Sequence, residues 1–311
     1  MAKILFTENV HSVGPELLKA AGHDVVFADR DDDVIRKEIV DAAAVIVRNS
    51  ELPAEVLAVA KDLKIVSKHG VGVDNVDLDY CKKAGVAVTV TPDANGQSVA
   101  EHAFALMIAL AKNIVPVSGA YRKIGFAAKN SPAGVELLGK TVGLIGLGRI
   151  GKRFAKMCGS GFDMKVLAYD PYLPEAPEGV TLIPDLDEML RESDVVSIHT
   201  VLTDGTRHII NKERLALMKP SAILINCSRG AMVDEPALIE ALQNGKIAAA
   251  GLDVTDPEPV APDSPLFQMS NVIVTPHYAP VTAEAAQRVC RIAAENVVAV
   301  LSGKEPVGRL V

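Results

Sequence analysis

The feature that most constrains this chain is a glycine-rich turn that follows an apolar run in the middle of the sequence. Residues 141–145 are apolar and predict a strand, and Gly146, Gly148 and Gly151 follow in the pattern GxGxxG. In this setting the first glycine allows a tight turn, the second lets the backbone approach a pyrophosphate, and the third lets the next helix pack on the strand. The helix N-terminus then offers unpaired N–H groups to the anion. The motif therefore predicts a dinucleotide-binding turn.

The next predicted strand supports this reading and indicates which dinucleotide is bound. It ends at Asp170, 19 residues beyond Gly151. A carboxylate at this distance would accept hydrogen bonds from ribose hydroxyls and repel a 2′-phosphate, so we expect NAD in preference to NADP. Arg149 and Ile150, inside the turn, are further candidates for cofactor contacts. The same motif also fits an ordinary glycine-rich turn, or a site for another adenine nucleotide such as S-adenosylmethionine.

Strand-like runs alternate with helical segments on both sides of this turn. In the N-terminal part these runs are residues 3–6, 23–28, 43–47, 64–67 and 86–90. From residue 141 they are residues 141–145, 165–169, 195–199, 223–226, 248–252 and 272–275. Such alternation predicts right-handed crossovers and parallel sheets. The predicted fold class is α/β with two doubly wound parallel-sheet domains.

Length, charge and cysteine spacing exclude several classes of protein. The 311 residues suggest about two domains. The excess of 39 acidic over 32 basic residues gives a net charge of −7, the wrong sign for binding nucleic acid. The longest uncharged stretch, residues 264–283, is interrupted by prolines and cannot span a membrane as a helix. The four cysteines are too far apart for a CxxC metal or redox pair, and no export signal opens the chain, so we expect a cytoplasmic protein without a metal site.

Three polar residues follow predicted strands of the second series. Arg229 follows residues 223–226, Glu258 follows residues 248–252, and His277 follows residues 272–275. Because the carboxyl ends of parallel strands meet at one edge of a sheet, we expect these side chains on one rim. Arginine suits bidentate binding of a carboxylate, and histidine accepts and returns protons near neutral pH. The rim therefore suits proton transfer on an anionic substrate.

The chain resembles the D-isomer-specific 2-hydroxyacid dehydrogenases, especially phosphoglycerate dehydrogenases. The resemblance rests on residues 225–230, 253–259 and 275–277, together with residues 70–75 and 95–101, and it covers essentially the whole chain. It implies a flavodoxin-like substrate domain formed by residues 1–95 plus 286–311. It also implies an inserted Rossmann NAD-binding domain of residues 96–285.

The resemblance implies roles for the three rim residues. Arg229 would bind the substrate carboxylate and polarise the C2 oxygen. His277 would be the acid/base, and Glu258 would hydrogen-bond the far nitrogen of its ring. Cofactor contacts are implied for four further residues, with the last directed toward the nicotinamide amide: Thr200, Cys227, Ser228 and Asp253. Four other histidines match no acid/base position, and we assign them no catalytic role: His69, His102, His199 and His208.

The N-terminal part would contribute to substrate binding. Gly70, Val71 and Gly72 would present backbone N–H groups to the substrate carboxylate, since a side chain at the glycines would block the approach. Arg48 and Lys68 occupy positions that carry basic residues near the phosphate end of the substrate in phosphoglycerate dehydrogenases. A solvated lysine and a strand-end arginine without a ligand would fit the sequence almost as well.

The leading hypothesis is an NAD-dependent D-2-hydroxyacid dehydrogenase whose partner is a small 2-hydroxy or 2-oxo acid, with 3-phosphoglycerate first. Hydroxypyruvate or glyoxylate reductases and D-lactate-type dehydrogenases are the alternatives. A formate dehydrogenase would carry Gln in place of Glu258. A non-catalytic NAD(H)-sensing interaction protein on the same scaffold is a different class that shares these motifs.

Two expectations concern assembly and regulation. The apolar helix of residues 100–111 resembles the dimer-forming region of the family, so we expect a homodimer. The sequence ends soon after the predicted helix of residues 283–301, and we therefore expect no regulatory domain of the serine-sensing type.

Overall fold

The structure is a computed structural model that describes residues 1–311. The chain divides into two compact units. The first unit consists of Met1–Asn95 and Val281–Val311, and the second unit of Gly96–Pro280. The second crossing between the units follows Pro280, whereas the sequence analysis places that boundary at residues 285 and 286.

The first unit contains a five-stranded parallel sheet in the order β2-β1-β3-β4-β5. Its strands are β1 (Lys3–Phe6), β2 (Asp24–Phe27), β3 (Ala44–Val47), β4 (Ile65–Lys68) and β5 (Ala87–Thr89). Its helices are α1 (Val13–Ala20), α2 (Asp32–Glu38), α3 (Ala54–Leu57), α4 (Leu78–Ala84) and α11 (Ala283–Leu301). Helix ends carry their expected signals: the Asp77 side chain caps the start of α4, and Gly85 ends it in the left-handed conformation at φ 70°.

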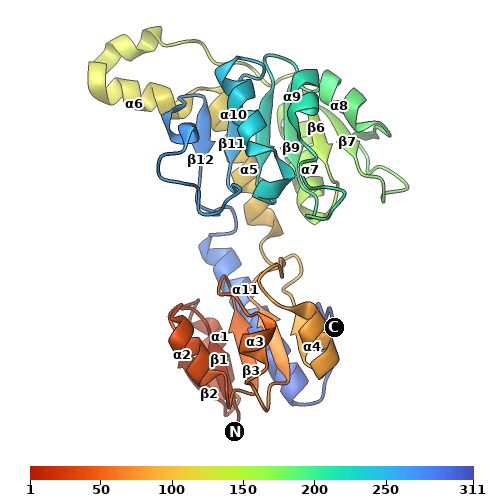
Figure 1. The fold of residues 1–311 in the computed structure, drawn as a ribbon. Coiled ribbons are helices and arrows are strands. Elements are labelled where there is room, and N and C mark those ends of the chain that lie inside the picture. Colours follow the sequence, from red (N-terminus) through yellow and green to blue (C-terminus); the bar gives the residue numbers. More distant parts are fainter. The chain divides into compact units, whose positions relative to one another are not determined.

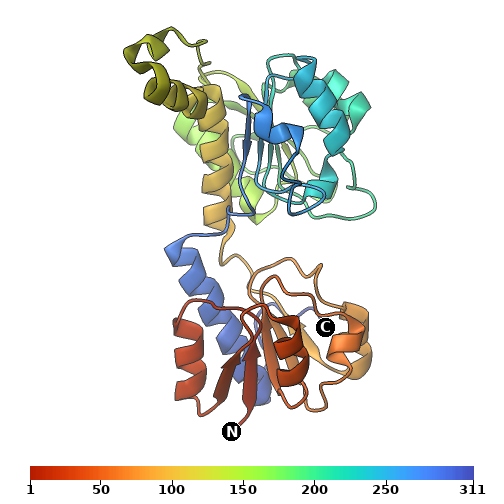
Figure 2. The ribbon, with the colours of Figure 1, turned by 60° about the vertical axis from the view of Figure 1, so that its left-hand side comes forward.

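The last long helix completes the core of the first unit. Ile4 and Phe6 of β1 pack in one apolar cluster with Leu18 of α1 and with Cys290 and Val297 of α11. Figure 2 shows α11, in blue, running along this face of the sheet. The opposite face packs against the helices that connect the strands. The first 95 residues therefore depend on a segment almost 200 residues further along for half of their core.

The second unit contains a seven-stranded parallel sheet in the order β12-β11-β10-β9-β6-β7-β8. Its strands are β6 (Thr141–Ile145), β7 (Lys165–Tyr169), β8 (Val180–Leu182), β9 (Val195–Ile198), β10 (Ile223–Asn226), β11 (Ala249–Leu252) and β12 (Val272–Val274). Its α-helices are α5 (Gly96–Ala111), α6 (Ile114–Ile124), α7 (Arg149–Phe162), α8 (Leu186–Glu192), α9 (Lys212–Leu217) and α10 (Glu235–Gln243). Short 3₁₀ turns are η1 (Gly125–Asn130), η2 (Gly230–Met232) and η3 (Pro265–Gln268).

Helix α5 is a core helix of the second unit. Its buried residues Met107 and Leu110 join the cluster that also contains Phe154 of α7 and Ile225 of β10. A Cβ atom on Gly251 of β11 would lie 3.0 Å from Cβ of Leu106, so a glycine here lets the helix lie close to the sheet. The other face of the sheet is covered by the cluster that includes α8, α9 and α10.

Helix α6 and the turn η1 form an arm that projects from the second unit (Figure 1). None of the residues of α6 is buried, although several are large and apolar. No single helix of the chain is both long and apolar enough to cross a membrane, and one bent pair, α5 with the α6–η1 arm, meets the length and composition criteria only when taken together.

The structure confirms the α/β class and the two parallel sheets. It also contains a strand, β8, and a helix, α6, that stand outside the predicted series of strands and helices. β8 is a strand of three residues at the edge of the sheet, with none of them buried. α6 lacks the buried stripe on which the prediction of a helix depends.

Candidate active site

The glycine turn after β6 is shaped by close backbone contacts. Gly146 has φ +93°, and a Cβ atom there would lie 2.8 Å from the carbonyl oxygen of His199. A Cβ atom on Gly151 would lie 2.5 Å from the carbonyl oxygen of Gly146. At Gly148, by contrast, a Cβ atom would meet nothing within 4 Å. Two of the glycines are therefore required for packing, and the third leaves open space at the N-terminus of α7.

Asp170 ties the end of β7 to this turn. Its Oδ2 atom accepts a hydrogen bond of 2.9 Å from the backbone N–H of Leu147, and its Oδ1 atom accepts one of 3.1 Å from the N–H of Tyr172. The carboxylate is half-buried. Each oxygen keeps a second lone pair, so the group can still accept hydrogen bonds from ribose hydroxyls.

The turn lies at the point where the strand order of the second sheet reverses. β6 is followed by β7 and β8 on one side, while β9 and the later strands lie on the other. Ligands of doubly wound sheets bind at such a switch point, beyond the carboxyl ends of the strands. Thr200 follows β9 at the same edge, and Arg149 is exposed at the start of α7. The open space at Gly148 and the Asp170 carboxylate fit a dinucleotide.

The loop after β10 carries Arg229 and is held from both sides. Asn226 accepts a hydrogen bond from the N–H of Ser228 (3.0 Å) and donates one to the carbonyl of Arg229 (2.9 Å). A Cβ atom on Gly230 would lie 2.0 Å from the carbonyl oxygen of Thr255. The absence of a side chain at 230 thus brings the Arg229 loop against the loop that follows β11.

Cys227, in the same loop, does not suit nucleophilic chemistry. Burial, with a smaller contribution from the negative charge of Asp253, raises the pKa of its thiol far above the ordinary value. The thiol stays protonated at neutral pH. The cofactor contact that the resemblance implies for Cys227 is compatible with the structure if the backbone of this residue makes it.

His277 and Glu258 are brought together as the sequence predicts. Nδ1 of His277 lies 2.8 Å from Oε1 of Glu258, and both side chains are 45% exposed. His277 has φ +52°, a left-handed conformation that is uncommon outside glycine and asparagine. Its backbone N–H donates to the carbonyl of Asp253. The hydrogen bond to Glu258 leaves Nε2 directed away from the carboxylate and available for proton transfer.

The side chain of Asp253 holds the backbone that follows His277. Its oxygens accept hydrogen bonds from the N–H groups of Tyr278 (2.7 Å) and Ala279 (2.8 Å) and from the hydroxyl of Thr275 (2.5 Å). The carboxylate is fully buried. The sequence analysis directs Asp253 toward the nicotinamide amide, but the structure places its carboxylate inside the turn, where these donors occupy it.

His102 belongs to this network and was missed by the sequence analysis. Its Nε2 atom lies 3.0 Å from the Thr275 hydroxyl and 3.5 Å from Oδ1 of Asp253. His102 stands on α5, 173 residues before Thr275. The available signal was a single histidine within an otherwise apolar stretch of helix, a pattern that is common in protein cores.

The first unit holds the remaining predicted residues. Gly70 has φ +143°, and its carbonyl accepts hydrogen bonds from the backbone N–H (2.8 Å) and the hydroxyl (3.1 Å) of Thr91. The backbone N–H groups of Gly70, Val71 and Gly72 make no hydrogen bond within the protein. Val71 is exposed. All three donors are therefore available to an anion.

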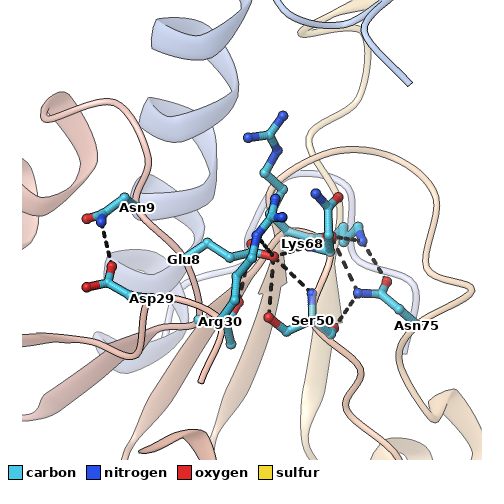
Figure 3. Close-up of polar contacts among 10 residues, drawn as sticks. Glu8, Asn9, Asp29, Arg30, Ser50, Lys68 and Asn75 are labelled. Atoms are coloured by element: carbon cyan, nitrogen blue, oxygen red, sulfur yellow. Dashed lines mark hydrogen bonds and ion pairs between the residues drawn. The ribbon is translucent and has the colours of Figure 1, made fainter. Parts of the chain in front are cut away.

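Lys68, which Figure 3 shows, and Arg48 occupy different environments. Lys68, at the end of β4, is buried; its Nζ atom donates to the backbone carbonyl of Arg48 and, over 2.6 Å, to Oδ1 of Asn75. The guanidinium of Arg48 makes no hydrogen bond or ion pair. Of the two predicted basic residues, only Arg48 therefore has a head group that the protein itself leaves unpaired. No cluster of three or more metal-ligating side chains is present.

Comparisons with known proteins agree with this geometry. Residues 104–279 match the family model described as the D-isomer specific 2-hydroxyacid dehydrogenase NAD binding domain. A D-3-phosphoglycerate dehydrogenase of Methanocaldococcus jannaschii is 42% identical over 98% of this chain, and this chain spans 58% of that relative's length. A glyoxylate reductase of Thermofilum pendens is 40% identical over 98% of this chain and 93% of its own length. The crystal structure of the TT0316 protein from Thermus thermophilus superposes with a TM-score of 0.93 at 37% identity, over 99% of this chain and 100% of that one.

The fold, the glycine turn and the histidine–glutamate pair define a nicotinamide-dependent dehydrogenase scaffold. The chain belongs to the D-isomer-specific 2-hydroxyacid dehydrogenase family, and its second unit is the NAD-binding domain of that family.

Proposed function

We propose that this chain catalyses reversible NAD-dependent oxidation of a D-2-hydroxy acid to the 2-oxo acid. In the oxidative direction the C2–H bond breaks with its electron pair, the hydroxyl O–H bond breaks, and a C2=O double bond forms. NAD supplies the hydride acceptor. The observation that carries the proposal is the 2.8 Å contact between His277 and Glu258 on the same sheet edge as Arg229.

Each residue has a defined task in this reaction. Nε2 of His277 accepts the hydroxyl proton as the C–H bond breaks, and returns it in the reductive direction. The negative charge of Glu258 beside Nδ1 stabilises the imidazolium that forms. Arg229 binds the substrate carboxylate. Glutamate at position 258 argues against formate oxidation, in which no hydroxyl proton is transferred.

The proposed cofactor is NAD in preference to NADP. Asp170, at the end of β7, presents a carboxylate to the side of the glycine turn where a ribose would lie, and its charge would repel a 2′-phosphate. Replacement of Asp170 by Ser should raise the ratio of kcat/KM for NADPH over that for NADH. An unchanged ratio would remove the basis for this preference.

The proposed substrate class is a D-2-hydroxy acid that resembles 3-phosphoglycerate, with hydroxypyruvate, glyoxylate and D-lactate as alternatives. The available N–H groups of Gly70, Val71 and Gly72 support binding of the carboxylate. The unpaired guanidinium of Arg48 supports a second anionic group on the substrate. A panel of 2-oxo acids should reveal at least one that oxidises NADH.

Variants would test the site. Arg229→Ala and His277→Ala should each lose at least a hundredfold in kcat/KM, in line with the general range for acid–base groups of about 10²–10⁴. Arg191→Ala and His11→Ala, on the exposed surface, are the matched controls. Tight NADH binding without turnover of any acid would favour the non-catalytic alternative, an NAD(H)-sensing protein.

We further propose a homodimer formed through the α6–η1 arm. The expected dimer helix, α5, buries Leu106, Met107 and Leu110 in its own unit, whereas Ile124 and Phe126 of the arm are 60% and 75% exposed. Phe126 lines an open apolar hollow of about 470 Å³ together with Ile114 and Tyr121. Large apolar side chains that are exposed together on one element are typical of interaction surfaces. The double variant Ile124→Asp/Phe126→Asp should sediment as a monomer, and an unchanged mass would exclude this surface.

A further inference from the structure

The turn of residues 48–50, after β3, leaves the sheet and must find partners for its backbone outside the ladder. Two of its N–H groups donate hydrogen bonds to one buried carboxylate, that of Glu8. Oε1 of Glu8 accepts hydrogen bonds from the N–H of Asn49 (2.7 Å) and the N–H of Ser50 (3.0 Å), and the Ser50 hydroxyl lies 3.3 Å away (Figure 3). Glu8, in the loop after β1, is only 4% exposed.

Two carbonyl groups of the same turn accept hydrogen bonds from two other side chains. Nδ2 of Asn75 donates to the carbonyl of Ser50 over 2.6 Å. The ammonium of Lys68 donates to the carbonyl of Arg48 and is itself held by Oδ1 of Asn75 (Figure 3). Buried charges are costly unless hydrogen bonds satisfy them. Here the Glu8 carboxylate accepts N–H groups of this turn, and the Lys68 ammonium donates to its Arg48 carbonyl and to Asn75. We call Glu8, Lys68 and Asn75 the turn clamp.

The turn clamp occupies the switch point of the first sheet. The order β2-β1-β3-β4-β5 reverses between β1 and β3, and Glu8 and residues 48–50 follow these two strands. Sheets of this order bind ligands in the crevice at that position. Because the carboxylate of Glu8 already accepts the N–H groups of Asn49 and Ser50, those donors do not serve an external anion.

Two arginine side chains supply positive charge at this edge of the first sheet. Arg48 is half-buried, and no group of the protein pairs with its guanidinium. Arg30 is 61% exposed, with Nε 3.6 Å from Oε1 of Glu8. His69, next to Lys68, adds no charge at neutral pH, since burial and the charge of Arg48 lower its pKa to about 4. A half-buried guanidinium without a partner favours an anionic ligand.

We propose that Glu8, Lys68 and Asn75 are positioning residues: they fix the turn of residues 48–50 and so set the place of the Arg48 guanidinium, for which the proposed function already gives a second anionic group of the substrate as ligand. This inference rests on the proposed function, which supplies the reaction and the 2-oxo acid. It differs from the sequence-based expectation for Lys68, because Lys68 acts through the backbone of Arg48 and makes no contact with the substrate.

The test compares 3-phosphohydroxypyruvate with hydroxypyruvate, which lacks only the phosphate. Arg48→Met should raise KM for the phosphorylated acid by roughly 10- to 100-fold, the range of a hydrogen bond between charged groups, with kcat within about twofold. Lys68→Met should raise the same KM about tenfold by the same reasoning. In both variants KM for hydroxypyruvate should rise less than KM for the phosphorylated acid, and Lys64→Met, an exposed lysine before β4, is the charge-loss control.

The double variant Arg48→Met/Lys68→Met separates positioning from direct contact. If Lys68 acts only through Arg48, the double variant has the KM of Arg48→Met alone. If the two effects multiply, Lys68 contacts the phosphate directly and the inference is wrong. Lys68→Arg, which keeps a donor and the charge, should recover part of the affinity for the phosphorylated acid.

Hydrogen exchange of the backbone amides tests the clamp without activity. Glu8→Ala should accelerate exchange of the Asn49 and Ser50 N–H groups at least tenfold relative to wild type, whereas Arg48→Met should leave it unchanged; unchanged exchange in Glu8→Ala overturns the clamp. Failure of the wild type to reduce either acid would contradict the proposed function and leave this exchange result standing. Equal use of both acids by the wild type would overturn selection by Arg48.

Discussion

Nδ1 of His277 donates a hydrogen bond of 2.8 Å to the carboxylate oxygen Oε1 of Glu258, and this contact joins the loop after β11 to the loop after β12. Because the carboxylate fixes which ring nitrogen is turned toward it, the other nitrogen is free for the substrate. The two residues therefore function as one unit, which gives the first prediction.

Replacement of Glu258 by Gln should lower kcat by roughly 10- to 100-fold with little change in KM, because the amide keeps the hydrogen bond but no longer stabilises the imidazolium. Steady-state kinetics in both directions would measure this. Asp263→Asn, an exposed acid in the same loop region, is the matched control. Full activity in Glu258→Gln would mean that the carboxylate is not required.

Asp253 should act on the loop and not on the cofactor. In Asp253→Asn an NH₂ group, which is a donor, replaces one of the two oxygens that accept backbone N–H groups. A buried N–H group that loses its acceptor in this way costs about 1–3 kcal/mol. We expect a lower free energy of unfolding in urea and a lower kcat. The Kd for NADH should change by less than about threefold, because loss of one hydrogen bond of this kind to the cofactor would raise that Kd by more. A large rise in that Kd together with unchanged stability would restore the nicotinamide contact.

Gly230 should tolerate no side chain. A Cβ atom at this position would lie 2.0 Å from the carbonyl oxygen of Thr255, so the two loops must separate in Gly230→Ala and Arg229 must move. Loss of at least tenfold in kcat/KM and a lower Tm are expected, since backbone shifts of this type cost about 1–3 kcal/mol. In Gly205→Ala, the control, the nearest atom to the new Cβ lies 3.8 Å away. Similar behaviour of the two variants would contradict the close approach.

The buried His199 and the partly buried His69 should make the protein less stable in acid. Burial lowers the pKa of His199 to about 3, and burial together with the charge of Arg48 lowers that of His69 to about 4, from 6.5. As the pH falls below about 6.5, the unfolded chain binds protons that the folded protein does not, so the free energy of unfolding decreases until about pH 4 for His69 and pH 3 for His199. Above about pH 6.5 neither residue contributes to the pH dependence.

Urea unfolding between pH 4 and pH 8 would measure this slope. His199→Gln should flatten it by a few kcal/mol over the range, since one pKa unit corresponds to about 1.4 kcal/mol. His11→Gln, at an exposed position, should leave it unchanged. An identical slope in His199→Gln and wild type would show that His199 is protonated in the folded state.

The parts of the site that the sequence predicts are those with a local pattern. The glycine turn, Asp170 and the loops with Arg229 and Glu258 each follow a strand, so strand prediction alone places them at a sheet edge. The edge strand β8 and helix α6 escaped prediction because neither carries a buried apolar pattern.

The contacts that escaped prediction join residues far apart in the chain. Glu8 and Asn49 are 41 residues apart, and His102 and Thr275 are 173 residues apart. A lone glutamate after the first strand is indistinguishable in sequence from a solvated acid. Its burial and its two backbone partners depend on the order of β1 and β3 in the sheet, which the alternation of strands and helices does not specify.

The return of α11 to the first unit has a consequence for biosynthesis. Ile4, Phe6 and Leu18 are synthesised before the whole second unit, whereas Cys290 and Val297, their partners in the apolar cluster, are synthesised after it. The second unit is continuous in sequence and can fold as soon as Pro280 has emerged, since domains generally fold as units during synthesis. The core of the first unit therefore stays incomplete until the second unit and α11 have been synthesised, and one apolar face of its sheet lacks its covering helix during that time.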